Sequence, residues 1–369
     1  MDKCQIRVLF NLPRPHLHGG PATHLPLLEK ELRKYADLEL FEYYRKTDTE
    51  TVWNKVVGRS RDLLELRVKI STFKPDIIHH NTAFDSIAIL RDAPLVWLAK
   101  RYATPVLLKM HGSSDDLLRN VSAPLRQLRD FILKNTSCIG VLSQVEKDHY
   151  LETWPFLHNR VKVVKNIIMA DFHTLERKEA KVPTLLFISR FIRDKGMFEL
   201  LEAVPQVLRK FPTARFIFVG SGTDAAEFDK KVERNNFVRS VQRIEHIEHC
   251  ETLKFYASAW ILVFPTHHPK EGMPMVVAEA MAAGLPIITT RTRFAQSYMG
   301  SQKHCLFVDH KNPETISDAI VHLLERDVLR SQMSRSNREL ARSFQAESVT
   351  QEFMNVYHDI ISNTTIPQV

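Results

Sequence analysis

Short apolar runs alternate along the whole chain with longer stretches in which apolar positions recur at helical spacing. In the first half, runs of strand length occupy residues 5–10, 38–43, 76–79, 105–110, 137–142 and 161–164. The pattern then restarts, with runs at 184–188, 214–219, 239–244, 260–264, 286–289 and 305–308. Strands that alternate with helices predict parallel βαβ units. We therefore expect two doubly wound, Rossmann-like α/β domains.

The segments between these runs have helical periodicity, as at 22–35, 94–102, 198–210, 225–235, 251–257, 275–283 and 313–326. The charged segment 176–181 lacks an apolar anchor and is expected to be a linker. We place an N-terminal domain at 1–172, a C-terminal domain at 173–345 and a last helix within 346–369 that could pack back on either domain, the N-terminal one included. The two domains are expected to face each other across a cleft lined by strand-to-helix loops, where open α/β sheets bind ligands.

The length of the chain is typical of two globular domains, and its charge is moderately basic. The chain has 369 residues and a net charge of +8, and residues 1–172 carry 26 Lys and Arg against 20 Asp and Glu. No run approaches 18 apolar residues, so no membrane-spanning helix is expected. The four cysteines are scattered without a Cys-x-x-Cys pair, which fits a reducing, cytoplasmic environment.

The segment 271–286 follows the strand predicted at 260–264 and carries two carboxylates. Glu271 precedes a Gly-x-Pro turn at 272–274, and Glu279 lies in the second turn of the helix that follows. The start of that helix offers unpaired N–H groups suited to an anionic or hydroxyl-rich ligand. The alternative is that Glu271 is an ordinary carboxylate favoured by the helix dipole.

A basic loop at 189–196 follows the strand predicted at 184–188. Arg190 offers a bidentate fork and Lys195 a point charge, and the pair would suit a diphosphate. A solvated basic loop is the alternative.

These two segments together resemble a known family. Ser189-Arg190-x4-Lys195-Gly196, followed by Glu271-x7-Glu279 and an Ala-x-Ala-x-Gly-x-Pro exit, is similar to the retaining nucleotide-sugar glycosyltransferases of the GT-B fold, family four, also called glycosyl transferases group 1. The resemblance covers most of the second domain. The first domain matches less closely, and the family's Asn-Gly turn is Asn166-Ile167 here.

The resemblance implies a donor site in the second domain formed by Arg190, Lys195, Ile247, Glu271, Gly272, Met273, Pro274, Met275 and Glu279. Arg190 and Lys195 would hold the donor diphosphate, and Glu279 would accept hydrogen bonds from the ribose hydroxyls. Glu271 and the backbone N–H groups after it would hold the sugar hydroxyls. The backbone at Ile247 would meet the base.

In the first domain, the resemblance assigns roles to two turns. Gly19 and Gly20 would let the backbone approach the phosphate and the acceptor, and His111 would contact the reacting sugar from the opposite wall. Glu271, His111, Arg190 and Lys195 are thus the expected catalytic residues.

Departure of a sugar from its nucleotide leaves negative charge on the diphosphate, which fixed cations and a helix start stabilise. The sequence has no Asp-x-Asp, so a metal is not expected to stabilise the leaving group. No other cofactor is expected. His246, His249, Cys250, His267 and His268 are a weaker candidate for a metal site. We prefer front-face substitution, in which the departing phosphate takes the acceptor proton. Double displacement with Glu271 as nucleophile is the alternative.

The implied function is transfer of a hexose from a UDP- or GDP-linked donor, with retention, to a hydroxyl of a lipid-linked or polysaccharide glycan, as in envelope or exopolysaccharide synthesis. Alternatives are another GT-B enzyme, such as a nucleotide-sugar 2-epimerase or a phosphorylase, and a non-catalytic sugar- or lipid-binding module. No nucleic-acid recognition motif is present, and nucleic acid is not an expected partner.

Two stretches of the first domain, 55–70 and 122–135, pair apolar faces with Arg and Lys. They could dock on an anionic membrane surface, which would make the protein peripheral to the inner face of the cell membrane. Ordinary amphipathic helices covering a sheet are the alternative. His79 and His80, with His16 and His18, are expected to flank the cleft.

Overall fold

The computed structural model describes residues 5–12, 20–43, 52–112, 121–245 and 247–365. The chain divides into two compact units. Unit 1 comprises Met1–Ile167 together with Ala346–Val369, and unit 2 comprises Ile168–Gln345. The C-terminal segment therefore belongs to the same unit as the N-terminal half of the chain.

Unit 1 is built on a sheet of parallel strands. In sheet order the described strands are β2 (Ala36–Phe41), β1 (Ile6–Asn11), β3 (Ile77–Thr82), β4 (Val106–Met110), β5 (Cys138–Val141) and β6 (Val161–Val163). Each lies within a few residues of an apolar run, so the prediction of a doubly wound sheet is confirmed for this half. The strand order reverses between β1 and β3, where ligands bind in such sheets.

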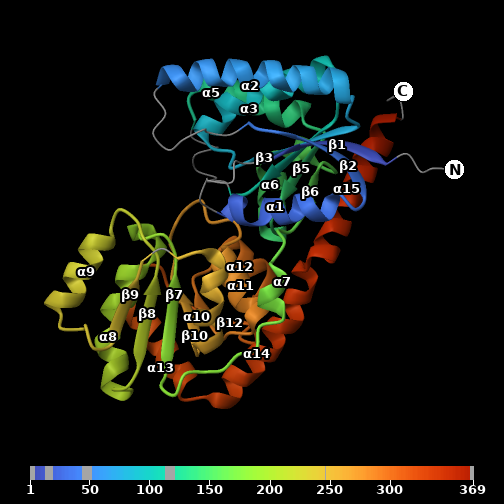
Figure 1. Ribbon diagram of the computed structural model, residues 1–369. Helices are drawn as coiled ribbons and strands as arrows, with labels where there is room; N and C mark the ends of the chain where they lie inside the picture. Colours follow the sequence, from blue (N-terminus) through green and yellow to red (C-terminus); the bar gives the residue numbers. More distant parts are fainter. Residues whose placement is uncertain (1–4, 13–19, 44–51, 113–120, 246, 366–369) are drawn as a thin grey trace. The chain divides into compact units, whose positions relative to one another are not determined.

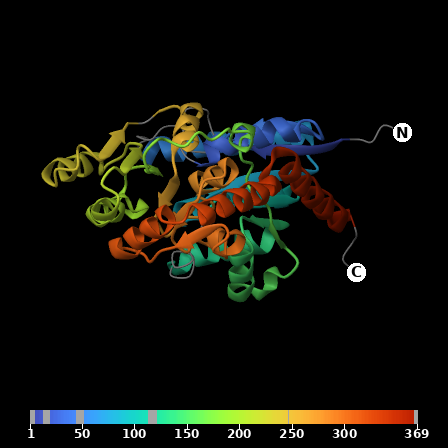
Figure 2. The same ribbon diagram turned by 90° about the horizontal axis from the view of Figure 1, so that it is seen from below.

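Successive residues of a strand point to opposite sides of the sheet, and in these strands both sides carry buried apolar residues. Helices therefore cover both faces. One face packs against α2 (Val52–Phe73), α3 (Ser86–Arg101), α5 (Ala123–Asn135) and α6 (Gln144–Thr153). The other packs against α1 (Gly20–Leu32) and the C-terminal helix α15 (Ala346–Thr365). Figure 1 and Figure 2 show α15, in red, running beside the blue N-terminal part.

Unit 2 repeats the arrangement. Its sheet order is β12 (Cys305–Phe307), β11 (Ile287–Thr289), β10 (Ile261–Phe264), β7 (Thr184–Ile188), β8 (Arg215–Val219) and β9 (Val241–Ile244). All of these pairings are parallel. The longer helices are α8 (Met197–Lys210), α9 (Ala225–Arg234), α11 (Met275–Ala283), α13 (Pro313–Leu324) and α14 (Asp327–Ala341).

Shorter helical segments complete unit 2. They are α7 (Ala170–His173), α10 (Leu253–Ser258) and α12 (Arg293–Tyr298), with one-turn 3-10 segments η2 (Arg193–Lys195), η3 (His249–Thr252) and η4 (Arg342–Phe344). A further 3-10 segment, η1 (Pro155–Leu157), lies in unit 1.

The segment 176–181 is not the free linker that its charge indicated. The Arg177 guanidinium donates to the carbonyl oxygens of Gly284 (2.8 Å) and Ala259 (2.7 Å), and the Lys178 N–H donates to the carbonyl of Ala257 (3.0 Å). These backbone acceptors anchor the segment on unit 2, although it has no apolar side chain to bury.

Within the part of the chain that the structure describes, no helix is both long enough and apolar enough to cross a bilayer.

Candidate functional site

The loop between β7 and α8 contains Lys195 and lies at the carboxyl ends of the parallel strands of unit 2. It ends at Gly196, whose φ of +85° lies in the left-handed region that favours glycine. A Cβ atom there would lie 2.3 Å from the carbonyl oxygen of Pro265, the residue that follows β10. Since β7 and β10 are neighbours in the sheet, this close approach joins the loops that follow the two strands.

Replacing Gly196 by alanine is expected to lower the free energy of unfolding by about 1–3 kcal/mol, because the methyl group meets backbone on a strained turn. Thermal unfolding measures the effect. Gly300→Ala is the matched control, since its Cβ would lie 3.2 Å from one carbonyl oxygen and its φ is not positive. Equal unfolding temperatures for the two variants would contradict the expected strain.

Lys195 and Glu271 form an ion pair. The Lys195 side chain is 8% exposed and the Glu271 side chain 14%. The Thr266 hydroxyl lies 3.2 Å from the same carboxylate oxygen and 3.2 Å from the carbonyl oxygen of Asp194. The structure therefore brings together one residue from each of the two segments that the sequence singled out.

The start of α11 follows Glu271 directly. Gly272, Met273 and Pro274 are buried, and no side chain caps the helix. The N–H groups of Val277 and Ala278 bond the Pro274 carbonyl (3.0 and 3.2 Å). An uncapped helix start leaves N–H groups for an outside acceptor.

The charge of Arg190 acts on the same side chain, His268, as the charges of Lys195 and Glu271. Arg190 follows β7 and is exposed. The pKa of His268 is lowered by burial and by the charges of Lys195 and Arg190, against the opposing charge of Glu271. The charges that act on the His268 ring therefore include both predicted cations and the predicted carboxylate.

Glu279 has partners that the sequence did not indicate. The carboxylate is 3% exposed. Its two oxygens bond His249 Nε2 (2.9 Å) and the Tyr256 hydroxyl, which donates at 2.8 Å. The Phe172 ring lies beside both partners, with centroids at 5.6 and 5.1 Å. A carboxylate has about four acceptor sites, and these two partners occupy two of them.

His249 shows how strongly Glu279 acts. Burial alone would lower the histidine pKa, but the hydrogen bond and the charge of Glu279 outweigh it and raise the pKa above 6.5. This interaction therefore stabilises the fold fully below about pH 6.5 and is lost as pH rises through the raised value. In Glu279→Gln the His249 pKa is expected to fall, as an NMR titration would detect. An unchanged pKa would contradict the pairing.

Two further residues of the predicted donor site lie in the loop after β9 and at the start of α11. Ile247 is half-buried between β9 and η3, and Met275 is the first residue of α11. Among the described residues, no group of three or more His, Cys, Asp or Glu is placed to hold a metal ion. His246, one of the weaker metal candidates, lies outside that part of the chain.

His79 and His80 do not lie at the unit surface, which corrects the expectation that they flank a cleft. Both are fully buried in β3. His79 Nδ1 bonds the hydroxyl of Tyr357 on α15 (2.6 Å), and His80 Nε2 bonds Asp92 on α3 (2.9 Å). Specific polar partners make this burial tolerable. His16 and His18 lie outside the described residues.

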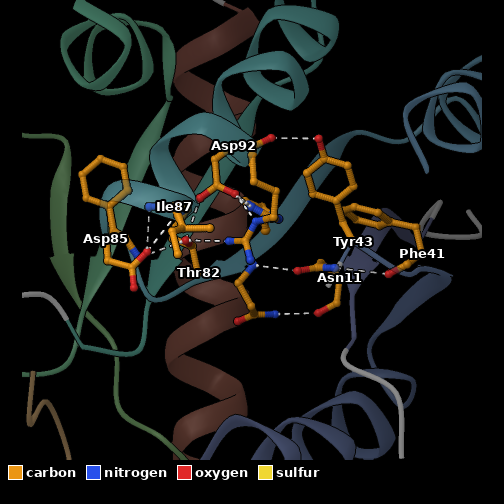
Figure 3. A network of polar contacts seen from close by, with 12 residues as sticks. Asn11, Phe41, Tyr43, Thr82, Asp85, Ile87 and Asp92 are labelled. Carbon is orange, nitrogen blue, oxygen red and sulfur yellow. Dashed lines mark hydrogen bonds and ion pairs between the residues drawn. The ribbon is translucent and has the colours of Figure 1, made fainter. Parts of the chain in front are cut away.

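Asp92 is the centre of a buried polar network at the end of β3. It accepts from the Thr82 hydroxyl (2.6 Å) and from Arg91 Nε (2.6 Å), and Tyr43 donates to the Arg91 carbonyl (2.8 Å). Figure 3 shows Asp92 and Thr82 pointing toward one another. Burial would raise the Asp92 pKa, but Arg91 and His80 outweigh it and lower the pKa.

His111 follows β4 at the same edge of the sheet. Its Nε2 lies 2.7 Å from Asn81 Oδ1, and its ring centroid is 5.0 Å from that of His24 on α1. Gly112, which follows His111, has a φ of +140°, a conformation that side chains disfavour. Gly20 is the first residue of α1, and Gly19 lies outside the described residues.

Residues 171–340 match the family of glycosyl transferases group 1. This part of the chain belongs to that family. The match spans the basic loop, the Lys195–Glu271 pair and α11, so the group 1 region contains the whole predicted donor site.

Similarity to known proteins extends beyond this region to most of the chain. An uncharacterized glycosyltransferase of Methanocaldococcus jannaschii is 24% identical over 356 residues, which are 93% of this chain and 95% of that protein. The alpha-monoglucosyldiacylglycerol synthase of Acholeplasma laidlawii is 22% identical over 318 residues, 79% of this chain and 77% of that protein. The crystal structure of Anabaena HepE in complex with UDP matches 96% of this chain and 100% of that chain, with 14% identity and a TM-score of 0.76. The chain has the GT-B fold, as the sequence predicted.

The sequence alone did not reveal which side chains form hydrogen bonds with Glu279 of the predicted donor site. His249 and Tyr256 are 30 and 23 residues away from Glu279, and no local pattern links them. Asn81 in unit 1 was detectable, because the polar run His-His-Asn-Thr ends an apolar strand at the edge where ligands bind.

Proposed function

We propose that the chain transfers a hexose from a UDP- or GDP-linked donor to an acceptor hydroxyl with retention of anomeric configuration. The proposed acceptor is a lipid-linked or polysaccharide glycan, in keeping with the synthesis of glucosyldiacylglycerol named for the Acholeplasma relative. The observation that carries the proposal is the Lys195–Glu271 pair beside the uncapped start of α11.

The proposed role of the cations follows from the charge of the leaving group. Breaking the anomeric C–O bond places negative charge on the diphosphate. Lys195 has three N–H donors, so it can keep Glu271 and also donate to a phosphate oxygen. Arg190 would add a bidentate fork, and the amides at the start of α11 would complete a preorganised anion site.

Glu271 is proposed to hold sugar hydroxyls and not to act as nucleophile. Its carboxylate is ion-paired with Lys195, and the Thr266 hydroxyl lies 3.2 Å away. A carboxylate held by a cation is a weaker nucleophile, which favours front-face substitution. Trapping a glycosyl adduct on Glu271 with a slow donor, detected by mass spectrometry, would contradict this mechanism.

The test of the function is nucleotide release from a panel of UDP- and GDP-sugars, with the anomeric configuration of the product read by NMR. Transfer releases the nucleotide, whereas an epimerase leaves it attached and a binding module releases none. Glu271→Ala is expected to abolish release. Unchanged release from every donor in this variant would contradict the proposal.

An anionic membrane surface is the proposed second partner, and the supporting surface lies on α2 and α3 of unit 1. Exposed apolar side chains gather there: Leu64, Val68, Ile87, Leu90 and Trp97, each 57–80% exposed. Leu64 and Trp97 also line a groove of about 770 Å³, whose charged lining residues are Arg67 and Arg101. Apolar side chains with arginines suit anionic lipid.

The other basic stretch forms α5, and its apolar face packs inward. Leu125, Leu128 and Phe131 of α5 pack against the unit 1 core, and Ile132 is fully buried. The amphipathic pattern of α5 therefore covers the sheet, as the alternative interpretation had it.

Co-sedimentation with phosphatidylglycerol vesicles tests this surface. The Leu64→Ser/Trp97→Ser variant is expected to lose binding, and neutral phosphatidylcholine vesicles should bind the wild type weakly. Val238→Ser is the control, because Val238 is an apolar residue of unit 2 that is 60% exposed. Equal sedimentation of both variants would contradict the proposal.

A further inference from the structure

Two hydrogen bonds hold His111 in unit 1, one at its backbone and one at its imidazole ring. The backbone N–H of His111 donates to the carbonyl oxygen of Thr82, the last residue of β3 (2.9 Å). Its side chain meets Asn81, where Nε2 lies 2.7 Å from Oδ1. Asn81 is fully buried and pairs in register with Lys109 of the neighbouring strand β4. Backbone and ring are therefore both held by the end of β3.

The orientation of the Asn81 amide decides which nitrogen of His111 carries the proton. Asn81 Nδ2 donates to the backbone carbonyl oxygen of Asn11 at the end of β1 (2.7 Å). A carbonyl oxygen can only accept, so the amide nitrogen must face Asn11 and the amide oxygen must face His111. That oxygen also only accepts, and His111 Nε2 must therefore carry a hydrogen.

The surroundings of the ring keep it neutral. Burial and the nearby groups His24 of α1, Lys109 of β4, and His79 and His80 of β3 lower the His111 pKa well below 6.5. A neutral ring with its hydrogen on Nε2 leaves a lone pair on Nδ1. That atom is enclosed and has no hydrogen-bond partner in the part of the chain that the structure describes.

We propose that Asn81 is a positioning residue that holds His111 as the Nε2–H tautomer, so that Nδ1 accepts a hydrogen bond from a hydroxyl of the transferred sugar. The inference rests on the proposed function and on the contact between His111 and the reacting sugar that the family resemblance implies. An enclosed acceptor without a partner is costly, and a sugar hydroxyl supplies the missing donor. A sugar derivative lacking that hydroxyl would leave Nδ1 unpaired.

The tautomer is measurable without activity. In the nitrogen-15 spectrum of the imidazoles of the full chain, with His111 assigned by comparison with His111→Gln, Nε2 is expected to be protonated and Nδ1 unprotonated from about pH 6 to about pH 8. A proton on Nδ1 in this range overturns the proposal. This readout is independent of catalysis, so it separates failure of the inference from failure of the proposed function.

A double-mutant cycle tests the coupling to catalysis. Asn81→Ala is expected to lower kcat/KM for the donor by about tenfold, the scale of one lost hydrogen bond. In the His111→Ala background the same change is expected to have little further effect, because Asn81 acts through the ring. Equal losses in both backgrounds, or no loss in the wild type, overturn the proposal.

Asn135→Ala is the matched control for that cycle. Asn135 also donates from Nδ2 to a backbone carbonyl, that of Phe131 (2.8 Å), but it ends α5. Its replacement is expected to leave kcat/KM unchanged, and a tenfold loss there would overturn the assignment to Asn81. If the wild type releases no nucleotide from any donor, the proposed function fails, while the nitrogen-15 spectrum still decides the tautomer.

Discussion

Replacing Lys195 by methionine is expected to lower kcat for nucleotide release by about 100- to 1,000-fold. The side chain is only 8% exposed, so its charge acts in surroundings that screen it weakly. Loss of one preorganised group that stabilises developing negative charge costs about this much in other enzymes. The methionine keeps most of the apolar stem, so the effect reports mainly on the charge. Release at saturating donor measures it.

Arg193→Met is the matched control for Lys195→Met. Arg193 lies in the same 3-10 turn, but it is 53% exposed and pairs with Glu227 (2.8 Å). Its replacement is expected to leave kcat nearly unchanged. Thermal unfolding of both variants shows whether they remain folded. If folded Lys195→Met releases nucleotide as fast as Arg193→Met, Lys195 has no role in departure of the diphosphate.

Unit 1 is expected to lose stability as pH falls below about 6.5. Burial, with the charges of Lys109 and His80, lowers the pKa of His79 to about 3, although a hydrogen bond that Asn81 accepts from the protonated ring opposes this. Between about pH 6.5 and pH 3 the unfolded chain therefore binds one more proton at this position than the folded chain. The free energy of unfolding must then fall as pH falls, by about 1.4 kcal/mol per pH unit.

Hydrogen exchange of the β1 and β3 amides, corrected for intrinsic rates, measures this effect. Between about pH 7 and about pH 5, His79 is expected to account for about 2 kcal/mol of the change in opening free energy. His79→Gln should remove that part of the pH dependence, whereas exposed His158→Gln should keep it. An equal pH dependence in both variants would contradict neutral burial of His79.

The strands were predictable because each is an apolar run bounded by polar or turn residues. All twelve described strands fall on runs that the sequence marked. The helix α14 was not expected, because its apolar stripe is sparse and it buries Arg330 and Asn337 beside Met333 and Ala341. The Arg330 guanidinium lies 4.8 Å from the Trp260 ring centroid, a long-range contact that substitutes for an apolar side chain.

The residues of the candidate site that lie close together in short sequence motifs were predictable. The loop with Arg190 and Lys195 and the pair Glu271 and Glu279 are readable as motifs, and the structure joins two of these residues in one ion pair. The polar partners of the site were not readable. Tyr256 meets Glu279, and Asn81 meets His111, only through the packing of separate elements.

The central claim is that unit 2 binds a nucleoside diphosphate through Lys195, Arg190 and the start of α11. Titration calorimetry of UDP and of GDP into the full chain and into Lys195→Met tests it most directly. We predict that one nucleotide binds the wild type with one-to-one stoichiometry and binds the variant at least about tenfold more weakly, the scale of one lost charge-assisted hydrogen bond. Absence of binding by both nucleotides, or equal affinity in wild type and variant, would contradict the account.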